Sequence, residues 1–189
     1  YLSTVPVAIF GNTIFAARFV SAFSGVGVVL LTYLIMKFLV KSRNKERFSL
    51  SAAFVVAISP WAIHFSRRVV EGNLGLFFFL LAFYLFLRSL QKIQLFPLAA
   101  LFLGFSTHAY YSERIISLMF LAIFLTYYRN ILVKNRGWII FGLVIFAFTQ
   151  IPHLVTISNG AYARRFDQVS YFGNRAGGLS SVYYIVSEF

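Results

Sequence analysis

The sequence predicts an all-α, polytopic membrane protein with about six transmembrane helices. Of its 189 residues, 60% are hydrophobic and 12% are charged, whereas soluble domains average roughly 45–50% apolar and about 25% charged residues. A soluble fold of this length cannot bury so many apolar side chains and still present a charged surface. The apolar residues fall in long runs without strand alternation, and in lipid such runs satisfy their backbone hydrogen bonds only as helices. The absence of cysteine excludes a disulfide scaffold.

Six apolar runs define the expected helices. In chain order they are Thr13–Val40, Ser49–His64, Leu74–Leu90, Leu95–Tyr110, Ile115–Tyr128 and Trp138–Ile157. A span needs about 20 apolar residues at roughly 1.5 Å each, so the second, fourth and fifth runs are short. We expect these three to rely on snorkelling flanks or on local thinning of the bilayer. In the first run, small residues favour close approach of a neighbouring helix; they are Ser21, Ser24, Gly25 and Gly27.

Basic residues in the short loops predict the orientation of the helices. The loops that follow the first, third and fifth runs lie on one side if the runs alternate, and their basic residues are Lys41, Arg43, Lys45, Arg47, Arg88, Lys92, Arg129, Lys134 and Arg136. The positive-inside rule makes that side cytoplasmic. We therefore expect an integral protein of the plasma membrane, or of the endoplasmic reticulum in a eukaryote, with both chain ends outside. The net charge of +12 is then explained mainly by loop residues that orient the helices in the membrane. No stretch of the chain is polar enough to form a nucleic-acid-binding surface.

The domain prediction is one transmembrane domain over residues 1–189, with residues 158–189 as the start of an outer-face region. Because the chain begins at Tyr1 and ends in a polar, aromatic stretch, we expect it to be a fragment of a longer protein.

Polar chemistry collects at the opposite, outer face. All five lysines are predicted inside, whereas every basic residue predicted outside is arginine. Two outer loops, Phe65–Asn73 and Thr107–Arg114, hold most of the polar groups together with the nearby His64. Arginine forks bind phosphate oxygens bidentately, which suits a phosphate-bearing ligand at a membrane boundary.

Structural interpretations of the same residues remain open. Arg67 and Glu71 are four residues apart, so on one helix they would share a face and pair. Glu113 and Arg114 are also open to a purely structural pairing, and the histidines at helix ends to interfacial hydrogen bonding. No HxxxH or carboxylate–histidine spacing predicts a metal site.

Three stretches together resemble polyprenyl-phosphate-dependent glycosyltransferases of the GT-C type, and in particular protein O-mannosyltransferase-like and aminoarabinose-transferase-like enzymes. The first is IFGNTIFAARFVSAFSG, with Gly11, Ala17 and Arg18. The second is AISPWAIHFSRRVVEGN, with Ser59-Pro60, His64, Ser66, Arg67, Glu71 and Asn73. The third is GFSTHAYYSERIISLM, with Tyr110 and Arg114. RRFDQVSYF resembles the start of the larger outer region of that family.

The resemblance implies part of a GT-C membrane domain and an inverting transfer of a sugar from a dolichyl- or undecaprenyl-phosphate donor. The acceptor would be a protein, lipid or glycan at the outer or lumenal face, as in protein glycosylation or cell-envelope synthesis. The family's catalytic acidic pair is expected in an outer loop before Tyr1, so the fragment by itself is expected to be inactive. The implied donor-phosphate and substrate-binding residues are Arg67, Arg114, His64, Glu71, Arg18 and Tyr110. No cofactor is required by the resemblance, which leaves a divalent metal open.

Two other classes compete with an enzyme. A transporter or flippase of lipid-linked saccharides would place its polar groups near the bilayer midplane on repeated halves, whereas this sequence keeps them at helix ends and shows no repeat. A non-catalytic membrane assembly protein would leave the outer arginines unexplained.

Overall fold

The protein is all-helical in a computed structural model, which describes residues 4–67, 71–110 and 112–158. Each of the six apolar runs falls on helix, so the predicted all-α class is confirmed. Within the described residues, three helical stretches are long and apolar enough to cross a membrane: Ile14–Leu39, Glu71–Ser89 and Arg129–Val155. A bent helix pair, Lys45–Ile58 with Pro60–Arg67, makes up to four if it counts as one span.

A short helix that none of the six runs covers precedes the first span. It is α1 (Thr4–Phe10), and it ends at Gly11, whose φ of 72° is a left-handed conformation that glycine adopts without a steric penalty. Helix α2 (Ile14–Leu39) then begins at a capping residue, since Thr13 Oγ1 accepts a hydrogen bond of 3.1 Å from the Ala16 N–H. The predicted start of the first run at Thr13 therefore agrees with the observed cap.

The second run is two helices where one was expected. Helix α3 (Lys45–Ile58) stops at Ser59, which is extended, and α4 (Pro60–Arg67) follows at an angle of 57°. The cause is Pro60, which disfavours helical backbone at the preceding residue and sits at the first position of a new helix. Much of the outer loop expected at Phe65–Asn73 is also helical, because α4 continues to Arg67 and α5 begins at Glu71.

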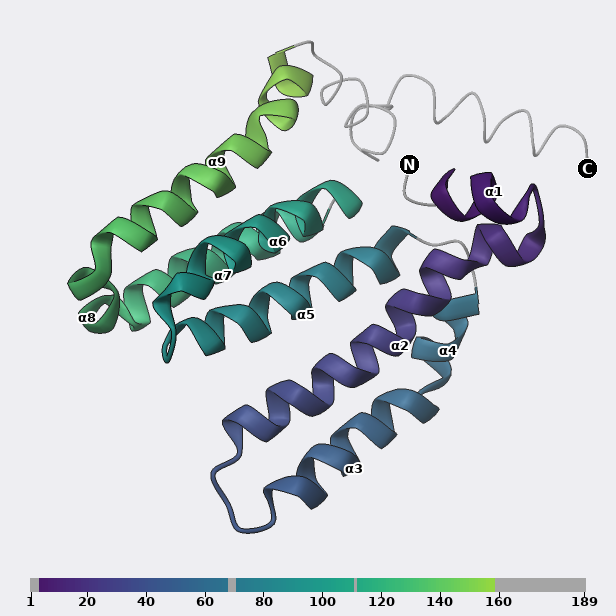
Figure 1. Ribbon diagram of the computed structural model, residues 1–189, viewed down its shortest axis with the longest axis horizontal. Coiled ribbons are helices and arrows are strands. Elements are labelled where there is room, and N and C mark those ends of the chain that lie inside the picture. Colours follow the sequence, from purple (N-terminus) through teal and green to yellow (C-terminus); the bar gives the residue numbers. More distant parts are fainter. Residues whose placement is uncertain (1–3, 68–70, 111, 159–189) are drawn as a thin grey trace, which may run out of the picture. The chain divides into compact units, whose positions relative to one another are not determined.

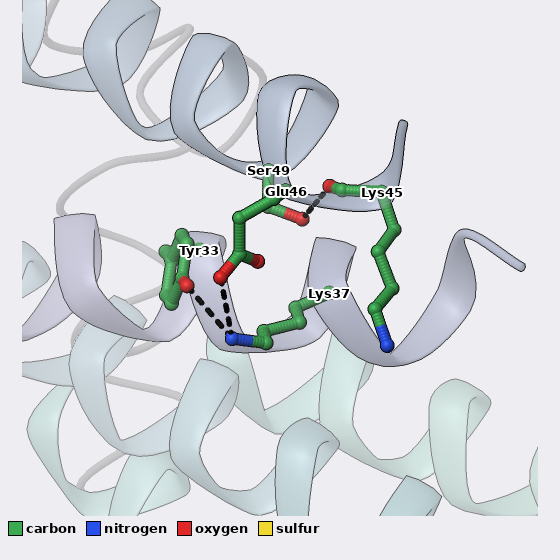
Figure 2. A network of polar contacts seen from close by, with 5 residues as sticks. All are labelled: Tyr33, Lys37, Lys45, Glu46 and Ser49. Carbon is green, nitrogen blue, oxygen red and sulfur yellow. Dashed lines mark hydrogen bonds and ion pairs between the residues drawn. The ribbon is translucent and has the colours of Figure 1, made fainter. Parts of the chain in front are cut away.

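A charged clamp joins α2 to α3 beside the loop at residues 40–44. Lys37 Nζ donates hydrogen bonds of 2.9 Å to Tyr33 Oη and 2.9 Å to Glu46 Oε1, and Figure 2 shows the three side chains meeting between the two helices. At the start of α3, Ser49 Oγ donates to the Lys45 carbonyl at 2.7 Å. The two helices thus form a hairpin, visible in Figure 1, with α3 running back along α2.

The main core lies among the later helices. Helix α5 (Glu71–Ser89) leads through η1 (Ile93–Leu95) to α6 (Phe96–Ala109), and α7 (Glu113–Tyr127) packs on both. The fully buried ring of Phe86 contacts the rings of Phe96 and Phe124 at centroid distances of 5.2 and 5.0 Å. Between α6 and α7, the buried hydroxyls of Ser106 and Ser117 share a hydrogen bond of 3.0 Å. Such small polar contacts are typical of helix packing in membranes.

The chain continues through α8 (Arg129–Leu132) and η2 (Val133–Asn135) into α9 (Arg136–Ser158). The chain divides into two units, residues 1–149 and residues 150–189. In the second unit the structure describes the end of α9, which carries Pro152 inside the helix. The outer-face region predicted for residues 158–189 lies, apart from Ser158, outside the described residues, as does Arg68.

Candidate functional site

A buried polar node joins α2, α4 and α5 near the residues predicted to lie at the outer face. Ser21 Oγ, on α2, donates to the Phe65 carbonyl of α4 at 2.9 Å. Asn73 Nδ2, on α5, donates to the Ser21 carbonyl at 2.7 Å. Both Ser21 and Asn73 are buried, and leaving such polar groups unpaired would be costly. The node holds three helices in one arrangement and so positions α4.

An apolar groove of about 690 Å³ lies between α2 and the bent pair α3–α4. It extends along α2 from Ala22 to Tyr33, about 16 Å at the helical rise per residue. Most of its lining is aliphatic, and Ser66 and Arg67 stand at the α4 end. Its remaining lining residues are Gly25, Val26, Val29, Leu30, Ala53, Val56, Ala57, Ala62 and Ile63. The groove thus combines a long apolar wall with one guanidinium.

A second cavity, of about 470 Å³, adjoins the groove and is lined by a larger number of polar residues. The two share Gly25, Val56, Ala62 and Ser66, so the contact of α4 with α2 separates them. A Cβ built on Gly25 would lie 2.9 Å from Ser66 Cβ and in closer conflict with Ser66 Oγ, which shows how tightly the helices cross. The aromatic residues of the second cavity are Trp61, Phe65 and Tyr110, and its polar residues include Ser59, Ser66, Asn73 and Glu113.

Glu113 carries the unusual electrostatics of this second cavity. Its Oε2 is buried and has no hydrogen-bond partner among the described residues. The side chain fits against α5 because Gly75 leaves space: a Cβ there would lie 3.3 Å from Glu113 Cγ and 3.2 Å from Tyr110 Cβ. Glu113 precedes the run Ile115–Tyr128, in the expected outer loop, and burial raises the pKa of its carboxyl above the ordinary value of 4.5.

The structure places two of the six predicted site residues in these hollows. Arg67, the last residue of α4, lines the groove, and Tyr110, which follows α6, lines the second cavity. His64, Glu71 and Arg18 are exposed and line neither. The interpretation of Arg67 and Glu71 as an ion pair on one helix is wrong. Although both residues are described, they form no ion pair, because Arg67 ends α4 and Glu71 begins α5.

Arg114 and His108 contribute to packing. The Nε of Arg114 donates to the Thr107 carbonyl at 3.3 Å, and the residue is half-buried at the start of α7. His108 Nε2 lies 2.6 Å from the Thr149 carbonyl and so links the end of α6 to α9. Beside this contact Thr149 fills the space next to Gly104, where a Cβ would lie 2.8 Å from Thr149 Cβ. Arg114 lines neither hollow, so the structure does not bring it into one cavity with Arg67.

Sequence reasoning noted Glu113 as part of the outer polar group but did not assign it to the site. The available signal was its spacing: Glu113 stands three residues after Tyr110 and two residues before the apolar run that begins at Ile115. Trp61 received no role at all, although it is 73% exposed and lines the second cavity beside the helix break. In the described part of the chain, no group of three or more His, Asp or Glu residues is placed to hold a metal ion.

Comparison with known proteins adds one finding. Residues 1–155 match the family model described as dolichyl-phosphate-mannose-protein mannosyltransferase. No curated protein and no solved structure matches the chain significantly. The matched residues include α1 to α7, the polar node, the groove and the second cavity. The chain, an integral membrane protein by its apolar helices, therefore belongs to the dolichyl-phosphate-mannose-protein mannosyltransferase family, whose members are polyprenyl-phosphate-sugar-dependent glycosyltransferases.

Proposed function

We propose that this chain is the donor-binding part of a membrane glycosyltransferase that transfers a mannosyl or related sugar from polyprenyl phosphate to a protein at the outer or lumenal face. Six spans oriented by the positive-inside rule belong to the same proposal, with α3 and α4 together as the second span. The family match supports the donor class. The observation that carries the proposal in this chain is the groove that ends at Arg67.

The groove fits a prenyl chain attached to a phosphate. An isoprenoid tail is apolar throughout, and the aliphatic wall from Val26 to Leu30 offers the matching surface. The phosphate lies at one end of the lipid, and Arg67, the charged residue among those that line the groove, lies at one end of the groove. This complementarity orients the lipid with its phosphate at α4 and its tail along α2.

Arginine has a chemical role in such a transfer. When the acceptor hydroxyl displaces the sugar, the bond from the anomeric carbon to the phosphate oxygen breaks and negative charge grows on the departing phosphate. A fixed guanidinium beside the phosphate stabilises that charge. We assign this role to Arg67. Arg114, which lines neither hollow, stays a proposed second contact. His64, Glu71, Arg18 and Tyr110 remain proposed as groups that orient donor or acceptor, and a carboxylate base from the preceding outer loop would take the proton of the hydroxyl.

The test is charge-conserving substitution in the full-length protein. Arg67→Lys keeps the charge but loses the bidentate fork, and the loss of one charge-assisted contact costs about 1.5–3 kcal/mol, or roughly ten- to a hundredfold in transfer rate. Arg114→Lys is expected to act in the same direction. Arg43→Lys, in the loop at the far end of α2, is the matched control and should transfer at the wild-type rate. Purified variants of equal thermal stability are assayed with a mannosyl polyprenyl phosphate.

Wild-type rates for both Arg67→Lys and Arg114→Lys would refute the phosphate contact. In that case the interfacial role of these arginines would be the better account.

A further inference from the structure

The second cavity has a chemistry that neither the prenyl chain nor the phosphate explains. Three aromatic side chains line it: Trp61, Phe65 and Tyr110. Hydrogen-bonding groups are interleaved with them, from Ser59 at the helix break to Asn73 in the polar node. A volume of about 470 Å³ lies within the range of roughly 300–1,000 Å³ typical of small-molecule sites. Such a cavity suits a compact ligand with both apolar and polar faces.

Glu113 narrows the class of ligand. A carboxylate accepts hydrogen bonds and does not donate them, and one oxygen of Glu113 is buried without a donor among the described residues. Burying such an oxygen is unfavourable unless a donor arrives or the carboxyl takes up a proton. A phosphate supplies no donor when ionised and would be repelled by the carboxylate. A ligand rich in hydroxyl groups supplies several donors and carries no opposing charge.

The position of the cavity also matters. It meets the groove at Gly25 and Ser66, where α4 lies against α2, and Arg67 follows Ser66 directly. A phosphate at Arg67 would lie at the α4 end of the groove, where the two hollows share Ser66. The prenyl tail occupies the aliphatic groove in the proposed function. The second cavity is then left for the substituent that the lipid phosphate carries at its other side.

We propose that the second cavity binds the sugar ring of the lipid-linked donor, with Glu113 accepting hydrogen bonds from ring hydroxyls and Trp61 packing against the C–H face of the ring. The inference rests on the proposed function, which it deepens by assigning a sugar-recognition residue that the phosphate contact does not need. It places the specificity for the sugar in a side chain separate from the arginine that holds the phosphate.

Two lipids separate these roles: a polyprenyl phosphate and the same lipid carrying mannose. Each is titrated against the full-length protein, and binding is measured directly, so that the chemical step is not involved. Glu113→Gln retains shape but presents a weaker acceptor, and we expect it to lower the affinity for the mannosylated lipid roughly tenfold. Its affinity for the bare phosphate lipid should stay at the wild-type value. Arg67→Lys should weaken the binding of both lipids.

Two further variants complete the experiment. Trp61→Ala removes an exposed ring, so the variant should fold normally. It should weaken the binding of the mannosylated lipid and leave the binding of the bare phosphate lipid unchanged. Glu46→Gln is the matched carboxylate control, because Glu46 pairs with Lys37 in the clamp beside residues 40–44 and lines neither hollow. It should leave the binding of both lipids unchanged.

Equal effects of Glu113→Gln on the two lipids, or no effect on either, would overturn the sugar-site inference while leaving the phosphate contact intact. If the wild-type protein binds the mannosylated lipid no better than a neutral prenyl alcohol, the proposed function fails and the sugar site fails with it.

Discussion

Gly25 is the position where a single methyl group should disturb both hollows. In Gly25→Ala the new Cβ would lie 2.9 Å from Ser66 Cβ, closer still to Ser66 Oγ, and 3.6 Å from Asn73 Nδ2. Overpacking of this kind costs about 1–3 kcal/mol, whereas alanine in a helix interior gains roughly 1 kcal/mol over glycine. Gly137→Ala is the matched control, because a Cβ there meets nothing within 4 Å and the helical gain is unopposed. The two variants should therefore differ by about 1–3 kcal/mol in favour of Gly137→Ala.

The assay is thermal unfolding in detergent. At roughly 2–4 °C per kcal/mol for a chain of this size, Gly25→Ala should unfold about 2–12 °C below Gly137→Ala. A double-mutant cycle identifies the clash: Ser66→Gly removes both conflicting atoms, so Gly25→Ala with Ser66→Gly should lose less stability than the sum of the single changes. Equal unfolding temperatures for Gly25→Ala and Gly137→Ala, or strict additivity in the cycle, would refute the close contact of α2 with α4.

Three further predictions follow from named contacts. Burial keeps Glu113 protonated to a higher pH in the folded than in the unfolded protein, so the stability of the fold should fall as pH rises from about 4.5 through the raised pKa. Glu113→Gln should remove this dependence and unfold at a higher temperature than the wild type at neutral pH. Parallel pH profiles of unfolding temperature for the two proteins would contradict the prediction. Asn73→Ala removes the buried hydrogen bond to the Ser21 carbonyl and should lower the free energy of unfolding by about 0.5–1.5 kcal/mol, measured by thermal unfolding. Asn12→Ala, at an exposed residue, should lower it little. Equal losses for the two variants would argue against the polar node. Single cysteines at Asn44 and Gly72 test the topology: an impermeant thiol reagent added outside should label only the Gly72 site, and the reverse pattern would invert the orientation.

Local features of the sequence predicted much of the helical structure. Apolar runs of sufficient length predict helices wherever the surroundings are lipid, and each of the six runs lies on helix. Errors arose where one residue changed the backbone: Ser59-Pro60 stands in the sequence, yet the run across it was expected as one helix and is two helices bent by 57°. The short α1 was missed because its seven residues form no span-length run.

The candidate site was harder to predict, because proximity in the sequence misled. Arg67 and Glu71 are spaced for a pair on one helix, but the chain leaves α4 between them and the pair does not form. Arg67 and Glu113 were both recognised as outer polar residues, yet only the first was assigned to the site. Nothing in the sequence near Glu113 shows that its Oε2 is buried, since the space for it is left by Gly75 on another helix.

The sequence by itself determined the class of the protein, its helical content and its family. Those properties depend on the length of the apolar runs, on the number of charged residues in each loop and on short motifs such as the one around Arg18. Only the tertiary structure decided which polar groups share a hollow. The groove and the second cavity are separated at the contact of Gly25 with Ser66, residues 41 positions apart in the chain (66 − 25). Close helix crossings of this kind depend on which small residues face each other across two helices, and that pairing is a property of the packed structure rather than of either helix alone.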